Sequence, residues 1–179
     1  MNTEHPKIFL HTCCAPCATA STLRLLKDDY DVVLFFSNSN IYPPEEYKKR
    51  LINARKLANI LKVPLIADDY DHESWQKWVR GLENEPEQGK RCEKCFHYSL
   101  ERTSKKAHEL NIPFFTTTLT ISPYKISPVI FRVGRQFPGF VDYNFKKKEG
   151  YKESIRLSRE WDLYRQNYCG CEYSLRVEG

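Results

Sequence analysis

The sequence predicts an α/β fold in which helices cover both faces of a parallel sheet, forming a three-layer sandwich. Short apolar runs bounded by turn residues alternate along the chain with longer segments whose apolar residues recur at helical spacing. Strands that alternate with helices build parallel sheets, because each return to the sheet needs a crossover. The 179 residues show no internal repeat and no Gly- or Ser-rich linker, so we expect a single domain over residues 1–179.

The first half of the chain is expected to hold three strands, each followed by a helix. The strands are the apolar runs KIFLHT, VVLFFS and VPLIA, at residues 7–12, 32–37 and 63–67. The helices are expected over 18–27, from Pro43 and Pro44 onward, and over 74–82. The middle helix has apolar residues at helical spacing, namely Tyr47, Leu51, Ala54, Ala58 and Leu61.

The second half continues the alternation after a polar loop at 83–90. A long helix is indicated by the apolar stripe of Phe96, Leu100, Thr103, Ala107 and Leu110. A fourth strand is expected at 113–119 and a possible fifth at 140–145, with helices at 129–137 and 152–164 and an irregular tail. The result is a Rossmann-like sheet, in which ligands bind beyond the carboxyl ends of the strands. Since the first strand ends at Thr12, Cys13 falls at that edge.

The number of cysteines and the expected cellular compartment together indicate what kind of chemistry the protein performs. The first apolar run is too short for a signal peptide or a membrane span, so we expect a cytoplasmic protein. Disulfides that serve as staples are rare in a reducing compartment, and seven cysteines cannot all pair. Clustered cysteines then indicate metal binding or redox chemistry.

The first cysteine group is CCAPC, with Cys13, Cys14 and Cys17. Neighbouring residues on a strand point to opposite faces, so Cys13 and Cys14 reach one site only if the chain turns there. Pro16 suits the first turn of a helix, and a helix N-terminus favours the thiolate that metals require. The alternative is three small core residues.

The second group is CEKC, with Cys92 and Cys95 beside Lys90, Arg91 and Lys94, cations that would stabilise thiolates. Joined to the first group across the strand edge, it supplies enough thiols for a four-thiolate site. Zinc and an iron–sulfur cluster suit four thiolates equally, so the spacing leaves both open.

The third group is CGC, with Cys169 and Cys171. Cysteines two apart close only a small, strained disulfide ring, and strain makes a disulfide easier to reduce. We therefore favour a redox-active pair over metal ligation, which would bring seven thiols to one site.

Charge is uneven along the chain. Residues 1–89 carry 11 Lys and Arg against 13 Asp and Glu, whereas residues 90–179 carry 17 against 10. A basic half suits a phosphate-rich partner, although a solvated basic surface explains it equally well. Lys146, Lys147 and Lys148 are candidate phosphate contacts, which Arg135, Lys152, Arg156 and Arg159 would extend.

Several other side chains belong to the same edge of the sheet. Thr116, Thr117, Thr118 and Ser122 follow the fourth strand and are candidate contacts for substrate hydroxyls. His11 is expected to point into the sheet, and we do not count it as a ligand. Trp75, Trp78 and Trp161 are expected to be packing residues.

The motifs CCAPC, KRCEKC and LYRQNYCGC, taken together, resemble the QueH-type epoxyqueuosine reductases. FTTTLTISPYK at Phe115–Lys125 and NSNIYP at Asn38–Pro43 resemble that family too. The resemblance implies a fold similar to adenine nucleotide α-hydrolases. It also implies reduction of epoxyqueuosine to queuosine in tRNA, the last step of queuosine biosynthesis. An epoxide oxygen is removed from a cyclopentane ring, leaving an alkene and water.

The resemblance also assigns roles to residues. Cys13, Cys14, Cys92 and Cys95 would bind a 4Fe-4S cluster, and Cys169 and Cys171 would form a redox-active disulfide. Cys17 would bind a second metal, such as a second iron, or nothing. Arg165 and Tyr168 precede the CGC pair and are candidate contacts to an extruded base of the tRNA.

Cofactors and partners follow from the same resemblance. An external donor would supply electrons. No cobalamin is expected, and no ATP, because CCAPC stands where the glycine-rich phosphate loop of ATP-using relatives would be. Two alternatives remain: a tRNA thiolase-like enzyme that uses ATP, and a zinc-stabilised RNA-binding domain without catalysis. The second leaves the CGC pair and Cys17 without a role.

Overall fold

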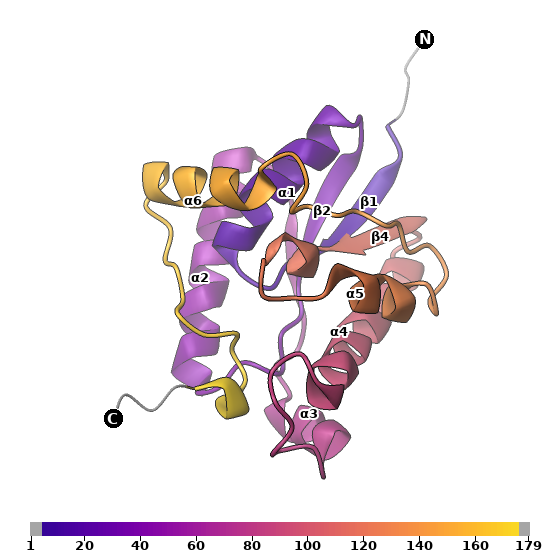
Figure 1. Cartoon of the computed structure of the whole chain (residues 1–179). Coiled ribbons are helices and arrows are strands. Elements are labelled where there is room, and N and C mark those ends of the chain that lie inside the picture. The colour runs from indigo at the N-terminus through magenta and orange to yellow at the C-terminus, as the bar shows by residue number, and fades with distance from the viewer. Residues whose placement is uncertain (1–4, 176–179) are drawn as a thin grey trace.

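The computed structural model describes residues 5–175 and contains one parallel sheet with helices packed around it (Figure 1). The strands are β1 (Lys7–His11), β2 (Asp31–Phe36), β3 (Leu65–Ala67) and β4 (Phe114–Thr117). The α-helices are α1 (Ala15–Lys27), α2 (Pro44–Leu61), α3 (His72–Val79), α4 (Lys90–Glu109), α5 (Ser127–Gly134) and α6 (Gly150–Glu160). Two short 3-10 helices, η1 (Thr118–Ile121) and η2 (Glu172–Ser174), complete the described elements.

The strand order is β3-β2-β1-β4, and all pairings are parallel. The chain moves outward from β1 to β2 and β3, and then returns past β1 to place β4 on the other side. The order therefore reverses between β1 and β4. In this register His11 lies opposite Thr117, so the chain leaves both strands at the same level. Such a reversal opens a crevice at the carboxyl ends of the two strands.

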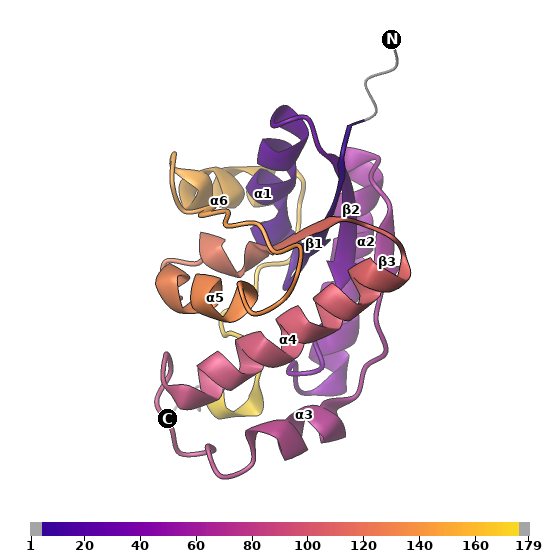
Figure 2. The same ribbon diagram turned by 90° about the vertical axis from the view of Figure 1, so that its right-hand side faces the viewer.

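Helices cover both faces of the sheet, as the sequence predicts. Helices α1 and α2 pack on one face, with α6 against α1, whereas α4 and α5 pack on the other (Figures 1 and 2). Alternate residues of β1 separate into the two cores: Phe9 packs with residues of α4, and Ile8 and Leu10 pack with residues of α1 and α2. Both faces are buried, which explains why β1 and β2 read as continuous apolar runs.

The expected fifth strand at 140–145 is wrong. Only Phe140 forms a bridge, to Phe115, and no strand is assigned there. Threonine side chains occupy the acceptors of this segment: the Thr116 hydroxyl donates to the Val141 carbonyl, and the Thr120 hydroxyl donates to the Tyr143 carbonyl. Only the start of the segment has backbone hydrogen bonds to β4, between Phe115 and the residues Gly139 and Val141, so no fifth ladder forms within the described residues.

Capping residues shift several helix boundaries from those expected. Helix α1 begins three residues early, because Cys14 caps it and Pro16 lies in its first turn. Helix α3 spans 72–79 rather than 74–82, since the Asp71 carboxylate accepts from the Ser74 N–H at 3.0 Å. Within residues 5–175, no helix combines the length and the apolar character needed to cross a membrane.

Candidate functional site

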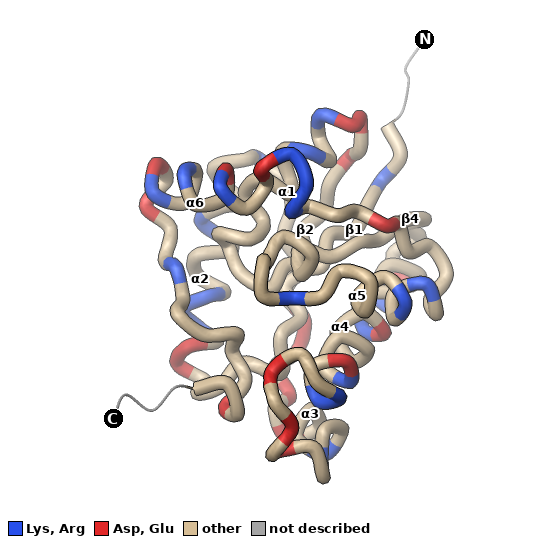
Figure 3. Tube along the Cα trace, viewed as in Figure 1, with Lys and Arg blue, Asp and Glu red and all other residues tan. Residues whose placement is uncertain are grey.

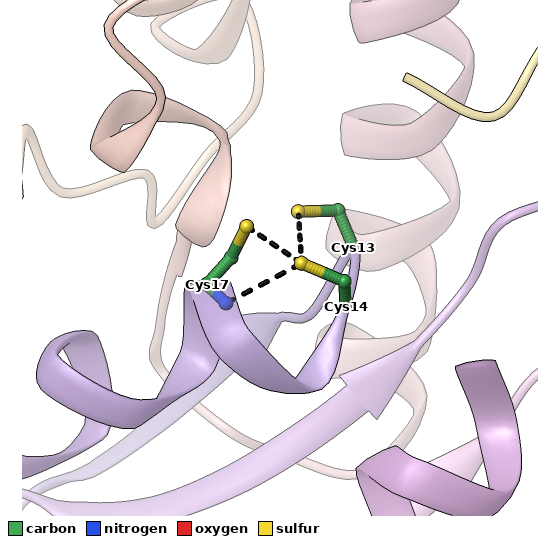
Figure 4. A group of neighbouring side chains, drawn as sticks. All are labelled: Cys13, Cys14 and Cys17. Carbon is green, nitrogen blue, oxygen red and sulfur yellow. Dashed lines mark hydrogen bonds between the residues drawn. The ribbon is translucent and has the colours of Figure 1, made fainter. Parts of the chain in front are cut away.

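The CCAPC motif forms a tight turn that brings three thiols together. Strand β1 ends at His11, and Cys14 is already the N-cap of α1, so the chain turns between them. The Sγ atom of Cys14 lies 3.9 Å from that of Cys13 and 2.6 Å from that of Cys17 (Figure 4). The three sulfurs lie within 4.8 Å of one another, close enough to hold one metal ion. The turn required for Cys13 and Cys14 to share a site is present.

The cap geometry favours a thiolate at Cys14. Burial alone would raise the pKa of its thiol, but hydrogen bonds from Cys13, Cys17 and Gln166 bring that pKa well below its usual value. The Cys17 backbone N–H also donates to the Cys14 Sγ atom, at 3.3 Å. The pKa of Cys17 is raised, chiefly by its hydrogen bonds to Cys13 and Cys14. Of the three sulfurs, Cys14 is therefore the one most ready to bind a metal cation.

Thr118 joins the group from the neighbouring strand. It is the first residue after β4, and its Oγ1 atom accepts from the Cys13 N–H at 3.1 Å and lies 3.2 Å from the Cys13 Sγ atom as a donor. The threonines at the end of the fourth strand were predicted to reach this crevice, but the prediction did not favour any one of them. The parallel pairing of β1 and β4 selects Thr118, because it puts the two strand ends side by side.

Cys92 and Cys95 enter the site from the N-terminal turns of α4. Burial raises the pKa of both thiols, and for Cys95 the charges of Cys169 and Cys171 add to that effect. The flanking cations do not bring the pKa of either thiol back below its usual value. The Lys94 ammonium donates to the Trp78 carbonyl instead, and Arg91 only partly offsets the burial of Cys92. These two thiols therefore gain a thiolate chiefly when a metal displaces the proton.

The CGC segment is anchored although it has no regular structure. The Arg50 guanidinium donates to the carbonyls of Cys169, at 2.9 Å, and Tyr168, at 3.2 Å. The Gly170 carbonyl accepts from the Tyr42 N–H, and the Cys171 carbonyl accepts from Ser174. Cys169 is exposed, Cys171 is buried, and both are free thiols. Anchored backbone beside an exposed thiol keeps the pair at the cavity while leaving Cys169 accessible.

These groups surround one cavity of about 600 Å³ at the carboxyl ends of the strands. Six of the seven cysteines line it, and the seventh, Cys14, has its sulfur within 3.9 Å of those of Cys13 and Cys17. Cys92 and Cys95 face the same cavity but lie outside the close group of Cys13, Cys14 and Cys17. A cavity of this size suits a small molecule or an extruded nucleoside. The three cysteine motifs, far apart in sequence, thus share one site.

Cations accompany the thiols in the cavity wall. Burial alone would lower the pKa of the half-buried Lys125 ammonium, but the negative charge of Cys169 and of the CCAPC cysteines raises it. Arg91 is 2% exposed, and its Nη1 atom donates to the carbonyls of Leu82, Glu83 and Glu85. Its Nε atom has no hydrogen-bond partner within residues 5–175. Lys125 was not predicted as a site residue, and its one signal in the sequence is its place in the ISPYK segment.

The residues proposed to contact nucleic acid fall into two places. Arg165 and Tyr168 line the cavity. Lys147 and Lys148 are exposed in the loop before α6, where Figure 3 shows a continuous basic stretch, whereas Lys146 is half-buried and donates to the Lys125 carbonyl. The expected extension of this patch is largely neutralised, because Arg135, Lys152 and Arg156 pair with Asp142, Glu149 and Glu153.

His11 and Trp75 are both buried, as expected, and both also reach the cavity wall. The His11 ring contacts the Thr117 hydroxyl at 2.9 Å and the Ser37 carbonyl at 3.1 Å, so both ring nitrogens are occupied. The Trp75 indole N–H lies near Cys95 and lowers the pKa of that thiol against the larger effect of burial, but it has no hydrogen-bond partner within residues 5–175. Trp75 thus has a contact with the site that its expected packing role did not include.

Comparison with known proteins assigns this cavity to a family. The family model described as "Epoxyqueuosine reductase QueH" matches residues 8–177, a span that includes all three cysteine motifs. The chain belongs to the epoxyqueuosine reductase QueH family. Its predicted family resemblance is therefore confirmed over nearly its full length.

Curated members of the QueH family from distant bacteria agree with this assignment. The chain is 40% identical to epoxyqueuosine reductase QueH of Streptococcus pyogenes serotype M1, over 97% of this chain and 72% of the relative. It is 38% identical to the Acinetobacter baylyi protein, with 95% and 81% covered, and 37% identical to the Thermotoga maritima protein, with 94% and 90% covered.

Solved structures confirm the expected fold class. The U34-tRNA thiolase NcsA from Methanococcus maripaludis, solved with its 4Fe-4S cluster, matches with a TM-score of 0.59 at 10% identity, over 97% of this chain and 63% of that chain. A predicted subunit of tRNA methyltransferase from Methanocaldococcus jannaschii matches with a TM-score of 0.52 at 13% identity, over 87% and 75%. The QueH chain therefore shares the α/β fold of these two proteins.

Proposed function

We propose that this protein reduces epoxyqueuosine to queuosine in tRNA, the last step of queuosine biosynthesis, in the cytoplasm. One observation carries the proposal: six cysteines from three motifs line a single cavity at the point where the strand order reverses. Membership of the QueH family supplies the substrate. A cavity surrounded by thiols suits reduction, because thiolates bind redox metals and dithiols carry electrons.

The residues of the cavity fit a 4Fe-4S cluster. Cys13, Cys14, Cys92 and Cys95 would hold it, and Cys17 would bind a second iron beside it. A thiolate-bound cluster carries negative charge, and within residues 5–175 the buried guanidinium of Arg91 donates to backbone carbonyls rather than to a carboxylate. The Nε atom of Arg91 and the Nε1 atom of Trp75 are buried N–H donors without partners in that range. Such donors suit sulfur atoms that only accept hydrogen bonds.

The electron count favours a role for the CGC pair. When bound, the cluster would supply electrons one at a time, and a second metal would supply Lewis acidity. Removal of the epoxide oxygen needs two electrons and two protons. Oxidation of the Cys169 and Cys171 thiols to a disulfide releases two of each, so one epoxide and two thiols yield one alkene, one water and one disulfide. An external donor then reduces the disulfide back to two thiols.

Binding of tRNA would use the charged rim of the site. Arg165 and Tyr168 would contact the nucleotide that enters the cavity, and Lys146, Lys147 and Lys148 would contact phosphates near it. Substituting the three lysines by Gln should weaken tRNA binding and flatten its salt dependence by about 0.7–0.9 in log–log slope per lost phosphate contact. The same substitution at the exposed Lys77, which pairs with Glu73 on α3, is the control. An unchanged slope would remove the lysine run from the interface.

Metal analysis tests the cofactor first. Protein purified without oxygen should contain about four irons with matching acid-labile sulfide. It should also reduce epoxyqueuosine in tRNA when a reductant is added. A single tightly held zinc without sulfide, and no turnover, would favour a zinc-stabilised RNA-binding domain and contradict the reductase proposal.

Cysteine variants separate the two roles. Cys92→Ser should lose iron and all activity, whereas Cys169→Ser should keep its iron and lose turnover. If Cys169→Ser kept full activity with an external reductant while Cys92→Ser lost all, the electron reserve would be wrong and the cluster would stand.

A further inference from the structure

Tyr124 lies at the edge of the cavity with most of its side chain in solvent. Five aromatic residues of the described chain line the cavity, namely Trp75, Phe96, Tyr124, Tyr151 and Tyr168. Only Tyr124 among them is exposed. At 71%, it is also the most exposed large hydrophobic side chain within residues 5–175. An aromatic ring that stays in water beside a nucleoside-sized cavity is available to a ligand at the cavity mouth.

The backbone of Tyr124 is fixed although its side chain is free. The residue belongs to the loop that follows η1 and leads into α5 (Figure 1). Its carbonyl accepts from the Gln88 side chain at 2.6 Å, and its N–H donates to the Ser122 hydroxyl at 3.2 Å. The next carbonyl, that of Lys125, accepts from the Lys146 ammonium. The ring therefore keeps its place at the mouth, while its exposed side chain can rotate to meet a planar partner.

Tyr168, which lines the same cavity, is held differently. Its hydroxyl donates to the Tyr42 carbonyl at 2.7 Å, and the Arg50 guanidinium lies 5.1 Å from the centroid of its ring. The Tyr168 ring thus already has partners within the chain. Tyr124 is the cavity-lining aromatic whose surface is largely left for a partner from outside.

The proposed substrate supplies such a partner. When a tRNA nucleotide enters the cavity, its neighbour stays at the mouth, because a single phosphate joins the two sugars. The base of that neighbour has then lost a stacking partner. Aromatic side chains replace lost stacking for any base, since every base has a π-face.

We propose that Tyr124 stacks on the base next to the modified nucleotide and so positions the tRNA over the cavity. This inference rests on the proposed function and extends it from the nucleotide that reacts to its neighbour in the chain. It also gives the exposed ring a role that the lysine run, which contributes only charge, does not fill.

Equilibrium binding without turnover tests the contact. The affinity of the oxidised, iron-loaded protein is measured for tRNA that carries epoxyqueuosine. Tyr124→Ala should weaken binding by about 10-fold, the value of one stacked base, and Tyr124→Trp should bind like the wild type. Ile52→Ala is the control, because Ile52 is 64% exposed on α2 and does not line the cavity, and its affinity should not change.

Removal of one neighbouring base identifies the partner. On tRNA that is abasic at the position Tyr124 contacts, wild type and Tyr124→Ala should bind equally. An abasic position on the other side of the modified nucleotide should leave the 10-fold difference in place. If Tyr124→Ala binds intact tRNA like the wild type, or stays about 10-fold weaker whichever base is removed, the stacking contact is wrong.

Turnover is measured separately, so the two proposals fail in different ways. Wild-type protein that binds the tRNA but does not reduce epoxyqueuosine would contradict the proposed function, and the binding comparison would still decide the Tyr124 contact. Wild-type protein that reduces epoxyqueuosine, with no loss of affinity in Tyr124→Ala, would contradict the Tyr124 contact alone.

Discussion

The hydroxyl of Thr118 contacts Cys13 twice, accepting from its N–H at 3.1 Å and donating to its Sγ atom at 3.2 Å. One side chain thus fixes both the backbone and the sulfur of the first cysteine after β1. Hydrogen bonds of this kind orient metal ligands and stabilise their anionic form.

Thr118→Val, which keeps the shape and removes the hydroxyl, should therefore lower iron affinity by about 10–100-fold. Iron retention against a competing chelator is the measurement. Thr118→Ser keeps the hydroxyl and should retain iron like the wild type. Equal retention in all three proteins would mean that the contact does not support metal binding.

Arg50 ties the CGC segment to α2. Its side chain is 2% exposed, and it pairs with Glu46 at 2.7 Å while it donates to the carbonyls of Tyr168 and Cys169. Arg50→Met leaves two carbonyls without this donor and leaves the half-buried Glu46 carboxylate with the Tyr164 hydroxyl but no cation, so unfolding free energy should fall by about 3 kcal/mol. Denaturant titration measures it. Arg55→Met, on the exposed side of the same helix, is the control, and a matching loss there would contradict this role.

Gly170 separates the two cysteines of the CGC motif with φ at +134°. A Cβ there would lie 3.1 Å from the Ile41 side chain and 3.2 Å from the Arg50 Nη1 atom. Gly170→Ala should cost about 1–3 kcal/mol of stability from backbone strain, together with a displacement of the CGC segment.

Gly81→Ala separates backbone strain from steric crowding. Gly81 also has a positive φ, at +86°, but open space surrounds its Cβ position. A larger loss at Gly170 in denaturant titration would measure the crowding against Arg50 and Ile41. Equal losses would show that strain alone matters there.

Asp68 should make stability depend on pH. Burial alone would raise the pKa of its carboxyl, but hydrogen bonds from Arg102, at 2.6 Å, and Ser37, at 2.7 Å, hold that pKa below its usual value of 3.8. A depressed folded-state pKa stabilises the fold at pH values above the unfolded value, and the stabilisation is lost as pH falls through the folded pKa.

Unfolding free energy of the wild type should therefore fall on acidification below about pH 4, and less steeply in Asp68→Asn. The exposed Asp31→Asn variant should follow the wild type. If the unfolding free energies of the wild type and Asp68→Asn fell equally with decreasing pH, this carboxylate would contribute nothing to the loss of stability in acid.

Local patterns in the sequence were sufficient to predict most of the strands and helices of the fold. The buried runs of β1 and β2 and the apolar stripe of α4 are periodic signals that neighbouring residues create by themselves. The segment 140–145 has the same kind of pattern, yet it does not form a strand. Its carbonyls accept side-chain hydrogen bonds from Thr116 and Thr120, which belong to another part of the chain, and its backbone hydrogen bonds to β4 end at Val141.

The residue types of the site and its family could also be read from the sequence, because three cysteine motifs are specific even without coordinates. Which cysteines lie together depended on the tertiary structure. The order β3-β2-β1-β4 sets Thr118 beside Cys13, and the path of the tail brings Cys169 to Arg50. These contacts join residues more than 100 positions apart, so no local pattern encodes them, and only the packing of the folded chain brings their atoms within hydrogen-bonding distance.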